Sequence, residues 1–209
     1  MILNEISEAL QAGNARKTKE LVQQAIDENI SVQDILTKGL IDGMNIIGSK
    51  FRNNEIFIPE VLISARAMNQ SIALLKPLLE SSGVKAVGKV CLGTVHGDLH
   101  DIGKNLVKLM LESKGFEVID LGTDVTAEMF VNSAVENDCP IICCSALLTT
   151  TRPVMGDVVK ALNAAGVHDK IKIMIGGAAV SQEFCDEIGA DYYTPDATSA
   201  AEIALSLVQ

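Results

Sequence analysis

The sequence contains no tryptophan, only five phenylalanines and two tyrosines, and no two cysteines in C-x-x-C spacing. A core poor in aromatic rings has to be built from Ala, Val, Ile and Leu, which suits helices packed on a sheet. The five cysteines are odd in number and lie mostly in apolar stretches, where thiols pack as small hydrophobic groups. The sequence therefore predicts free thiols and a reducing, cytoplasmic setting.

Long apolar runs and basic residues are also scarce. No stretch approaches the ~20 apolar residues that span a bilayer, and Met1–Glu5 lacks the basic start and apolar run of a signal peptide. We expect a soluble protein that is not exported. Seventeen basic residues against 27 acidic ones give a formal charge of -10, which repels phosphate backbones and anionic lipid. Nucleic acid and membrane are therefore excluded as expected partners.

The first 80 residues place apolar side chains at helical spacing and predict about four helices. Gly13-Asn14 separates the first helix from the second. Ser31 with Asp34 resembles a helix-capping signal, and Pro59 fits the first turn of the fourth helix. We expect an all-α four-helix bundle over residues 1–83. The small, weakly patterned stretch 81–88 reads as a linker to a second domain over 88–209.

After residue 88, short β-rich apolar runs alternate with helical segments. The runs cover 89–95, 116–121, 140–145, 171–175 and, weakly, 190–193, with helices starting near 103, 126, 152, 181 and 197. Five β–α units predict a doubly wound α/β domain with a five-stranded parallel sheet. Right-handed crossovers favour the flavodoxin-like order 2-1-3-4-5, with a ligand-binding switch point between strands 1 and 3.

Three loops at the carboxyl ends of the predicted strands carry the chemistry. The loop over 93–105 crowds two His and two Asp between glycines, the loop over 145–151 is rich in hydroxyls, and 176–178 reads Gly-Gly-Ala. All three should meet at the switch point. The loop over 122–124 lies to one side in this strand order and holds nothing comparable.

Single residues allow plainer interpretations. Taken alone, His100 would more often be a structural or exposed histidine than a metal ligand. His96 and His100 with Asp98 and Asp101 also resemble a zinc cluster, although this would not explain the hydroxyl and glycine loops. Cys143-Cys144 reads as strand packing, because neighbouring residues in a strand point to opposite faces.

The pattern Asp98-x-His100-x-x-Gly103, followed by Ser145-x-Leu147 and Gly176-Gly177, resembles the cobalamin-binding signature of methionine synthase and its corrinoid-protein relatives. The helical half, at 39–44 and 51–68, resembles the cap domain of the same family. The resemblance covers essentially the whole chain. It is greatest to stand-alone corrinoid proteins of three-component methyltransferase systems.

The resemblance implies a cobalamin bound base-off/His-on, in which His100 replaces the cofactor's benzimidazole as the lower axial ligand of cobalt. Asp98 would hydrogen-bond the other ring nitrogen, and Thr151 would take the place of the third member of a proton relay. In the cap, Phe51 and Ile58 would cover the upper face of the corrin ring. The cap residues that would support them are Val61 and Met44.

The resemblance also implies a slot beside the sheet for the displaced nucleotide tail. Residues with little or no side chain would leave the room, Ser145 and Thr149 would donate hydrogen bonds, and Leu147 would pack on the tail. Tyr193 and Ala197 would close the far end. The remaining residues implied in cofactor binding are Gly97, Leu99, Asp101, Ile102, Gly103, Gly176, Gly177 and Ala178.

By the same resemblance, the chain is a methyl carrier that is not a catalyst on its own. Its cofactor would be methylcobalamin, cob(I)alamin or a related corrinoid. Its partners would be a donor-specific methyltransferase, an acceptor methyltransferase using tetrahydrofolate or coenzyme M, and a reductive activating protein.

The alternative is a cobalamin sensor or regulatory module, which should append a basic DNA-binding segment. A receiver-like signalling domain would need Asp where Ser145 stands, and a mutase would need a barrel of ~250 residues.

Overall fold

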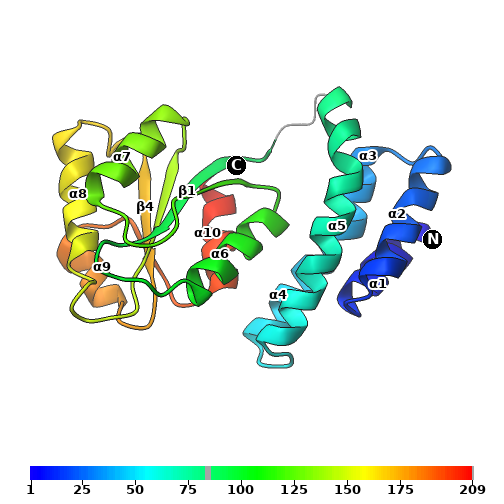
Figure 1. The fold of residues 1–209 in the computed structure, drawn as a ribbon, viewed down its shortest axis with the longest axis horizontal. Helices are drawn as coiled ribbons and strands as arrows, with labels where there is room; N and C mark the ends of the chain where they lie inside the picture. Colours follow the sequence, from blue (N-terminus) through cyan, green and yellow to red (C-terminus); the bar gives the residue numbers. More distant parts are fainter. Residues whose placement is uncertain (83–85, 209) are drawn as a thin grey trace. The chain divides into compact units, whose positions relative to one another are not determined.

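The computed structural model describes residues 1–82 and 86–208. The chain forms two compact units: Met1–Ala86 with Ser113–Gly115, and Val87–Glu112 with Phe116–Gln209 (Figure 1). Residues 83–85 of the predicted linker lie outside the described residues. The boundaries 1–83 and 88–209 therefore stay a prediction.

The first unit is helical, as predicted. Its third helix is a continuous run of three segments, α3, η1 and α4, of which η1 is a π-helix. The elements are α1 (Ile2–Gln11), α2 (Ala15–Asp27), α3 (Val32–Asp34), η1 (Ile35–Ile41), α4 (Asp42–Arg52) and α5 (Ile58–Ser82).

Local chemistry explains where these helices begin. Gly13 has a φ of +66°, and the next residue, Asn14, caps α2 by accepting a 3.1 Å hydrogen bond from the Lys17 amide. Ser31 caps α3 in the same way through the Asp34 amide at 3.0 Å. Pro59 lies in the first turn of α5, where its missing N–H costs nothing. All three predicted signals are confirmed.

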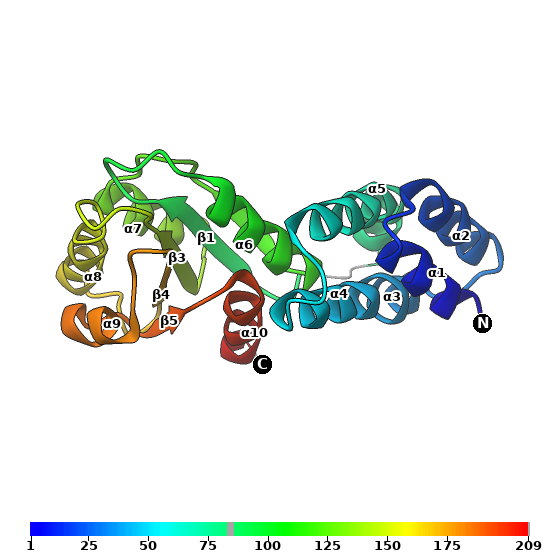
Figure 2. The same cartoon turned by 90° about the horizontal axis from the view of Figure 1, so that it is seen from below.

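The second unit is a five-stranded parallel sheet in the order β2-β1-β3-β4-β5, with helices on both faces, which confirms the predicted fold. Figure 2 shows α6 and α10 on one side of the sheet and α7, α8 and α9 on the other. The elements are β1 (Lys89–Thr94), α6 (Ile102–Ser113), β2 (Glu117–Asp120), α7 (Ala127–Glu136), β3 (Ile141–Ser145), α8 (Val154–Ala164), β4 (Lys172–Gly176), α9 (Gln182–Ile188), β5 (Tyr192–Thr194) and α10 (Ala197–Val208).

Successive side chains along each strand point to opposite faces of the sheet. Cys144 belongs to the apolar core beneath α7, α8 and α9, so its neighbour Cys143 points to the face of α6 and α10. Burial raises the pKa of Cys143 to about 12. All five cysteines are buried and free, which fits their predicted role as packing groups. On the second face, α10 buries only small side chains against the sheet, namely Ala197, Thr198, Ala200, Ala201 and Ala204.

No helix among the described residues combines the length and the apolar character that crossing a bilayer requires.

Candidate functional site

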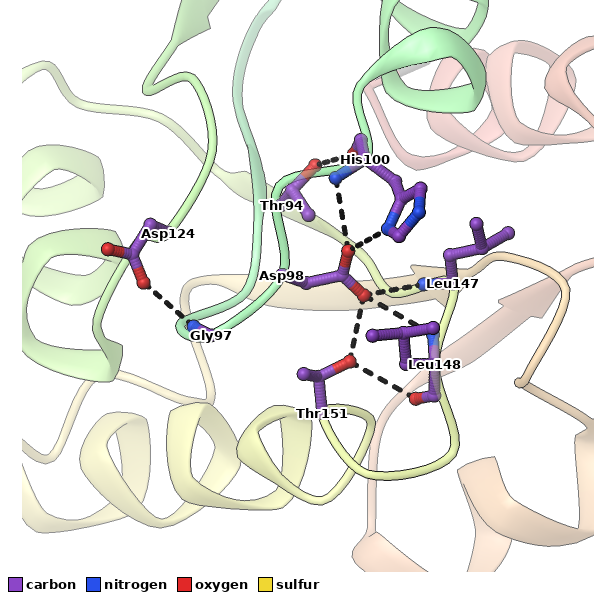
Figure 3. Close-up of polar contacts among 8 residues, drawn as sticks. All are labelled: Thr94, Gly97, Asp98, His100, Asp124, Leu147, Leu148 and Thr151. Carbon is purple, nitrogen blue, oxygen red and sulfur yellow. Dashed lines mark hydrogen bonds and ion pairs between the residues drawn. The ribbon is translucent and has the colours of Figure 1, made fainter.

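The candidate site is built on the loop between β1 and α6, at the carboxyl edge of the sheet (Figure 3). The loop begins with a turn in which the Asp98 amide donates to the Val95 carbonyl at 3.1 Å. The buried hydroxyl of Thr94, the last residue of β1, donates to the His100 carbonyl at 2.9 Å. Thr94 and Val95 therefore hold the backbone on both sides of Asp98.

The Asp98 carboxylate is fully buried and accepts five hydrogen bonds. Its Oδ1 accepts from the amide and the Nδ1 of His100, at 3.1 and 2.7 Å. Its Oδ2 accepts from the amides of Leu147 and Leu148, at 2.9 and 3.3 Å, and from Thr151 Oγ1 at 2.8 Å. Burial raises the pKa of Asp98, but these hydrogen bonds outweigh it and hold the pKa well below its ordinary value. The Asp98 carboxylate is therefore an anion that links the loop after β1 to the loop after β3.

The hydrogen bond to Asp98 sets the tautomer of His100. An ionised carboxylate only accepts, so Nδ1 carries the hydrogen and the neutral ring keeps its lone pair on Nε2. The side chain of His100 is 52% exposed, whereas that of Asp98 is 0% exposed. The ring is thus held from the buried side with its other nitrogen available. This is the arrangement of a metal-ligating imidazole with a carboxylate partner, and it fits the ligation of cobalt that the resemblance implies.

Thr151 lies beside Asp98, where the resemblance implied the third member of a relay. Its hydroxyl lies 2.8 Å from Asp98 Oδ2 and 3.1 Å from the Leu148 carbonyl, so its single hydrogen has two competing acceptors. The residue is buried. His100, Asp98 and Thr151 therefore form one connected hydrogen-bonded chain, while a role of Thr151 in proton transfer stays a prediction.

Thr151→Val should lower the free energy of unfolding of the apoprotein by about 1–2 kcal/mol, because it removes a hydrogen bond to a buried charge. Thr151→Ser keeps the hydroxyl and should lose less than half as much. Urea unfolding of both variants measures the difference. A loss in Thr151→Ser as large as that in Thr151→Val would mean that the hydroxyl stabilises the loop no more than the methyl group does, and would contradict the prediction.

The immediate surroundings of His100 are apolar and open. Leu99 and Ile102 are 73% and 75% exposed, and Leu147 and Leu148, whose amides hold Asp98, are 43% and 40% exposed. Large apolar side chains left in water at one place mark a surface that binds something apolar. Asp101 is also exposed and lies directly before α6, where it accepts a hydrogen bond from the Asn105 side chain at 3.1 Å.

The second and third predicted loops meet the first one, as expected. Parallel pairing places Thr94, Ser145, Gly176 and Thr194 side by side at the ends of four neighbouring strands. Since Cys144 faces α7, α8 and α9, this row faces α6 and α10. It presents three hydroxyls and a glycine. Thr94 and Thr194 were not predicted, because their strand register cannot be read from a single sequence.

Other predicted cofactor residues are divided between the two faces. Ala197 opens α10 and is buried, and Thr149 is exposed in the loop after β3. Tyr193 pairs with Ile175 and packs against the core beneath α7, α8 and α9. The structure thus places the Tyr193 side chain on the face opposite the Ser145 row. Ala178 follows the two glycines and is exposed.

The predicted glycines differ in what surrounds them. Gly177 has a φ of +122°, and a Cβ there would overlap the Ala146 carbonyl, so the fold itself requires glycine. A Cβ at Gly176 would approach the Thr194 carbonyl to 2.9 Å, and one at Gly97, whose φ is +81°, would lie 3.5 Å from Thr151. Beside Gly103 there is nothing within 4 Å. Of the four predicted glycines, Gly103 alone has open space beside it.

These surroundings predict opposite effects for two alanine substitutions. Gly177→Ala should destabilise the apoprotein by about 2–4 kcal/mol through backbone strain and overlap. Gly103→Ala should leave thermal unfolding unchanged or slightly higher, since alanine favours a helix, yet weaken cobalamin binding about tenfold if the cofactor uses this space. Calorimetry of the apoproteins measures the loss of stability, and titration with cobalamin measures the loss of binding. Unchanged binding by Gly103→Ala would remove this glycine from the cofactor site.

The structure also assigns a part to the loop over 122–124, which the sequence analysis set aside. Asp124 Oδ1 accepts from the Gly97 amide and lies 2.7 Å from His96 Nδ1 (Figure 3 draws the Gly97 bond). The expectation that this loop holds nothing comparable is therefore wrong. A contact between loops 27 residues apart leaves no local pattern in the sequence.

The helical unit carries the four residues implied as a cap. Met44 and Val61 are 1% and 0% exposed and belong to the bundle core. Phe51 is partly buried at the end of α4, and Ile58 is 41% exposed at the start of α5. Nearby large apolar side chains are also exposed, namely Ile46, Phe57, Leu62 and Ile63.

A zinc cluster has no support from the geometry. His96 pairs with Asp124 and His100 with Asp98, so the two histidines have separate partners. Within residues 1–82 and 86–208, no three His, Cys, Asp or Glu side chains are placed to hold a metal ion together.

A cavity of about 370 Å³ lies at the opposite, amino-terminal edge of β3 and β4. It lies at the end of the strands opposite the one that carries Ser145 and Gly176. Its lining includes Val135, Asp138, Cys139, Pro140 and Lys170.

Two family models match the chain, both described as a B12 binding domain: one over residues 2–76 and one over residues 88–205. A corrinoid protein of Desulfitobacterium hafniense is 40% identical over 97% of this chain and 95% of its own length. A dimethylamine corrinoid protein of Methanosarcina acetivorans is 39% identical over 99% and 97%. The crystal structure of the methanol:cobalamin methyltransferase complex of Methanosarcina barkeri matches with a TM-score of 0.88 and 32% identity, over 99% of this chain and 79% of that chain.

Proposed function

Because this chain belongs to the B12-binding corrinoid proteins of methyltransferase systems, we propose that it carries methyl groups between two partner enzymes. A donor-specific methyltransferase would load the methyl group, and a second methyltransferase would deliver it to coenzyme M or tetrahydrofolate. A reductive activating protein would restore cofactor that has been oxidised. The similar proteins include a dimethylamine corrinoid protein and a methanol:cobalamin methyltransferase complex, which favours a small methylamine or methanol as the donor.

One observation carries the proposal: a half-exposed imidazole whose Nδ1 is held by a buried, five-fold hydrogen-bonded carboxylate. When bound, the corrinoid cobalt supplies the centre that takes up a methyl group and gives it away again. His100 would ligate it from below through Nε2, in the base-off/His-on form, and Asp98 would fix the ring. The chain itself would position the cofactor, without a pocket for the methyl donor.

The chain of His100, Asp98 and Thr151 would also hold a proton. Asp98 stays ionised because its pKa is held low, so the proton of the pair resides on the Nδ1 of His100. Thr151 would keep the carboxylate oriented through its hydroxyl.

Apolar surface on each unit supports a site for a corrin ring. In the sheet unit, the exposed side chains of Leu99, Ile102 and Leu147 would contact the lower side of the ring. In the helical unit, Phe51 and Ile58 would cover the upper side, with the buried Met44 and Val61 supporting them from the core. Domains over 1–83 and 88–209 would thus divide the work into cap and cofactor carrier.

The nucleotide tail would lie along the face of α6 and α10. The support is the row formed by Thr94, Ser145, Gly176 and Thr194, together with the small buried residues of α10. Ser145 would donate to the tail, and Thr149, Gly103 and Ala197 would line its path. The five buried free thiols fit a reducing compartment, so we also propose a cytoplasmic location.

Transfer of a labelled methyl group tests this function. The apoprotein is reconstituted with cobalamin, reduced, and treated with methyl iodide carrying a carbon label. It is then given either coenzyme M with a coenzyme M methyltransferase or tetrahydrofolate with a tetrahydrofolate methyltransferase. Label on one acceptor supports a carrier and names the acceptor. Label that stays on the protein with both enzymes contradicts the carrier role and favours a sensor.

A further inference from the structure

The loop between β2 and α7 is hydrogen-bonded to the start of the loop that carries Asp98 and His100. The Thr94 amide donates to the Gly122 carbonyl at 2.9 Å, and the Val125 amide donates to the Thr94 carbonyl at 3.0 Å. Farther along, the Asp124 amide donates to the Asp98 carbonyl at 3.1 Å. Two of the three bonds are made by Thr94, which precedes the segment, and the third ends on the carbonyl of Asp98 itself.

The carboxylate of Asp124 adds a contact that no backbone group provides. Its Oδ1 accepts from the Gly97 amide at 2.7 Å, a short bond for an amide donor. The Gly97 amide is the main cause that lowers the pKa of Asp124 below its ordinary value. The same oxygen lies 2.7 Å from His96 Nδ1. Asp124 is 51% exposed, so the fold does not depend on burying it.

Gly97 is the residue whose backbone most needs such a contact. Its φ of +81° belongs to the left-handed region, and glycine loses more conformational freedom on ordering than any other residue. Gly97 immediately precedes Asp98, whose carboxylate aims the imidazole of His100. Asp124 accepts a hydrogen bond from the Gly97 amide and donates one to the Asp98 carbonyl. These two bonds therefore fix the backbone of Gly97 and Asp98, and with it the direction of the Asp98 side chain.

We propose that Asp124 is a positioning residue for the cobalt ligand: its carboxylate holds Gly97, and thereby sets where Asp98 places the ring of His100. The proposal rests on the proposed ligation of cobalt by His100. Asp124 touches neither His100 nor the cofactor in this role. Its effect passes through Gly97 and Asp98, and His96 is an additional partner of the carboxylate that the positioning does not require.

Three variants separate these contributions. Asp124→Ala removes the acceptor for the Gly97 amide, Asp124→Asn keeps an oxygen acceptor without the charge, and His96→Ala removes the second partner only. Each apoprotein is made with histidine that carries the heavy nitrogen isotope, reconstituted with cobalamin, reduced to the cob(II)alamin form, and examined by electron paramagnetic resonance for coupling of cobalt to that nitrogen. Cobalamin affinity is measured by calorimetry. Hydrogen exchange of the Gly97 amide is followed in the apoproteins, where no cofactor is needed.

We expect Asp124→Ala to bind cobalamin about tenfold more weakly and to show a new fraction of cobalt without protein nitrogen, with thermal unfolding of the apoprotein little changed. Its Gly97 amide should exchange faster than in the wild type. Asp124→Asn and His96→Ala should stay close to the wild type in all of these. Rescue by Asn distinguishes positioning of the loop from a general effect of charge.

Three results would overturn the inference, and they differ from one another. If the wild type shows protein nitrogen on cobalt and Asp124→Ala shows the same fraction and affinity, Asp124 does not position the ligand. If the wild type itself shows no protein nitrogen, the proposed ligation by His100 fails, and the positioning role fails with it. Gly97 exchange that is fast in the wild type would remove the hydrogen bond on which the inference is built.

Discussion

Replacing His100 with alanine is expected to abolish ligation of cobalt by the protein while leaving the apoprotein folded. The side chain is half exposed and its only described side-chain partner is Asp98, so its loss removes little packing. The visible spectrum of the reconstituted variant should change from that of a nitrogen-ligated corrinoid to that of a base-off corrinoid. Cobalamin affinity should fall at least about 10- to 100-fold, the range seen when metal-site partners are lost.

His96→Ala is the matched control, because it removes an imidazole from the same loop. His96 is 62% exposed and pairs with Asp124, not with Asp98. Its spectrum and affinity should equal those of the wild type. If His100→Ala keeps the nitrogen-ligated spectrum, or if both variants lose it equally, the assignment of the ligand to position 100 is wrong.

Asp98→Asn is expected to destabilise the apoprotein strongly, lowering its free energy of unfolding by about 3 kcal/mol or more. The two carboxylate oxygens accept five hydrogen bonds. An amide turns one of these acceptors into a donor that faces two or three other donors inside the protein. Chemical unfolding at neutral pH measures the loss.

The same comparison has a defined pH dependence. The pKa of folded Asp98 lies below its ordinary value of about 4, so its ionised form stabilises the fold above that pH. The advantage of the wild type over Asp98→Asn should therefore be full at neutral pH. It should shrink as the pH falls below about 4 towards the folded pKa.

Asp101→Asn is the control for Asp98→Asn, since it makes the same substitution three residues away at an exposed position. It should cost less than about 0.5 kcal/mol. A loss of stability in Asp98→Asn that is no larger than this, or a difference from the wild type that does not change with pH, would contradict a buried carboxylate.

Much of the fold could be predicted because it depends on local patterns. The apolar period changes from helical to strand-like near residue 88, and the starts of α2, α3 and α5 follow from Asn14, Ser31 and Pro59. The strand order followed from the right-handed crossover rule. The π-helical segment Ile35–Ile41 has no comparable signal, because its i→i+5 bonds depend on packing.

The sequence predicted those site residues that belong to a recognisable motif and missed those that do not. Asp98, His100 and Thr151 were identified by a resemblance that spans three loops, and the structure brings them into hydrogen-bonding contact. Asp124 was missed because its partners, Gly97 and His96, belong to a different loop. Glycine was interpreted as room for a ligand at Gly177, where the fold already requires it.

The central claim is that the Nε2 of His100, aimed by Asp98, ligates the cobalt of a bound corrinoid. The most direct measurement is electron paramagnetic resonance of the cob(II)alamin-reconstituted protein, made once with ordinary histidine and once with histidine carrying the heavy nitrogen isotope. The account predicts that the nitrogen splitting changes from the triplet pattern to the doublet pattern on labelling. A triplet that is unchanged by labelled histidine would show that the cofactor keeps its own base, and would contradict the claim.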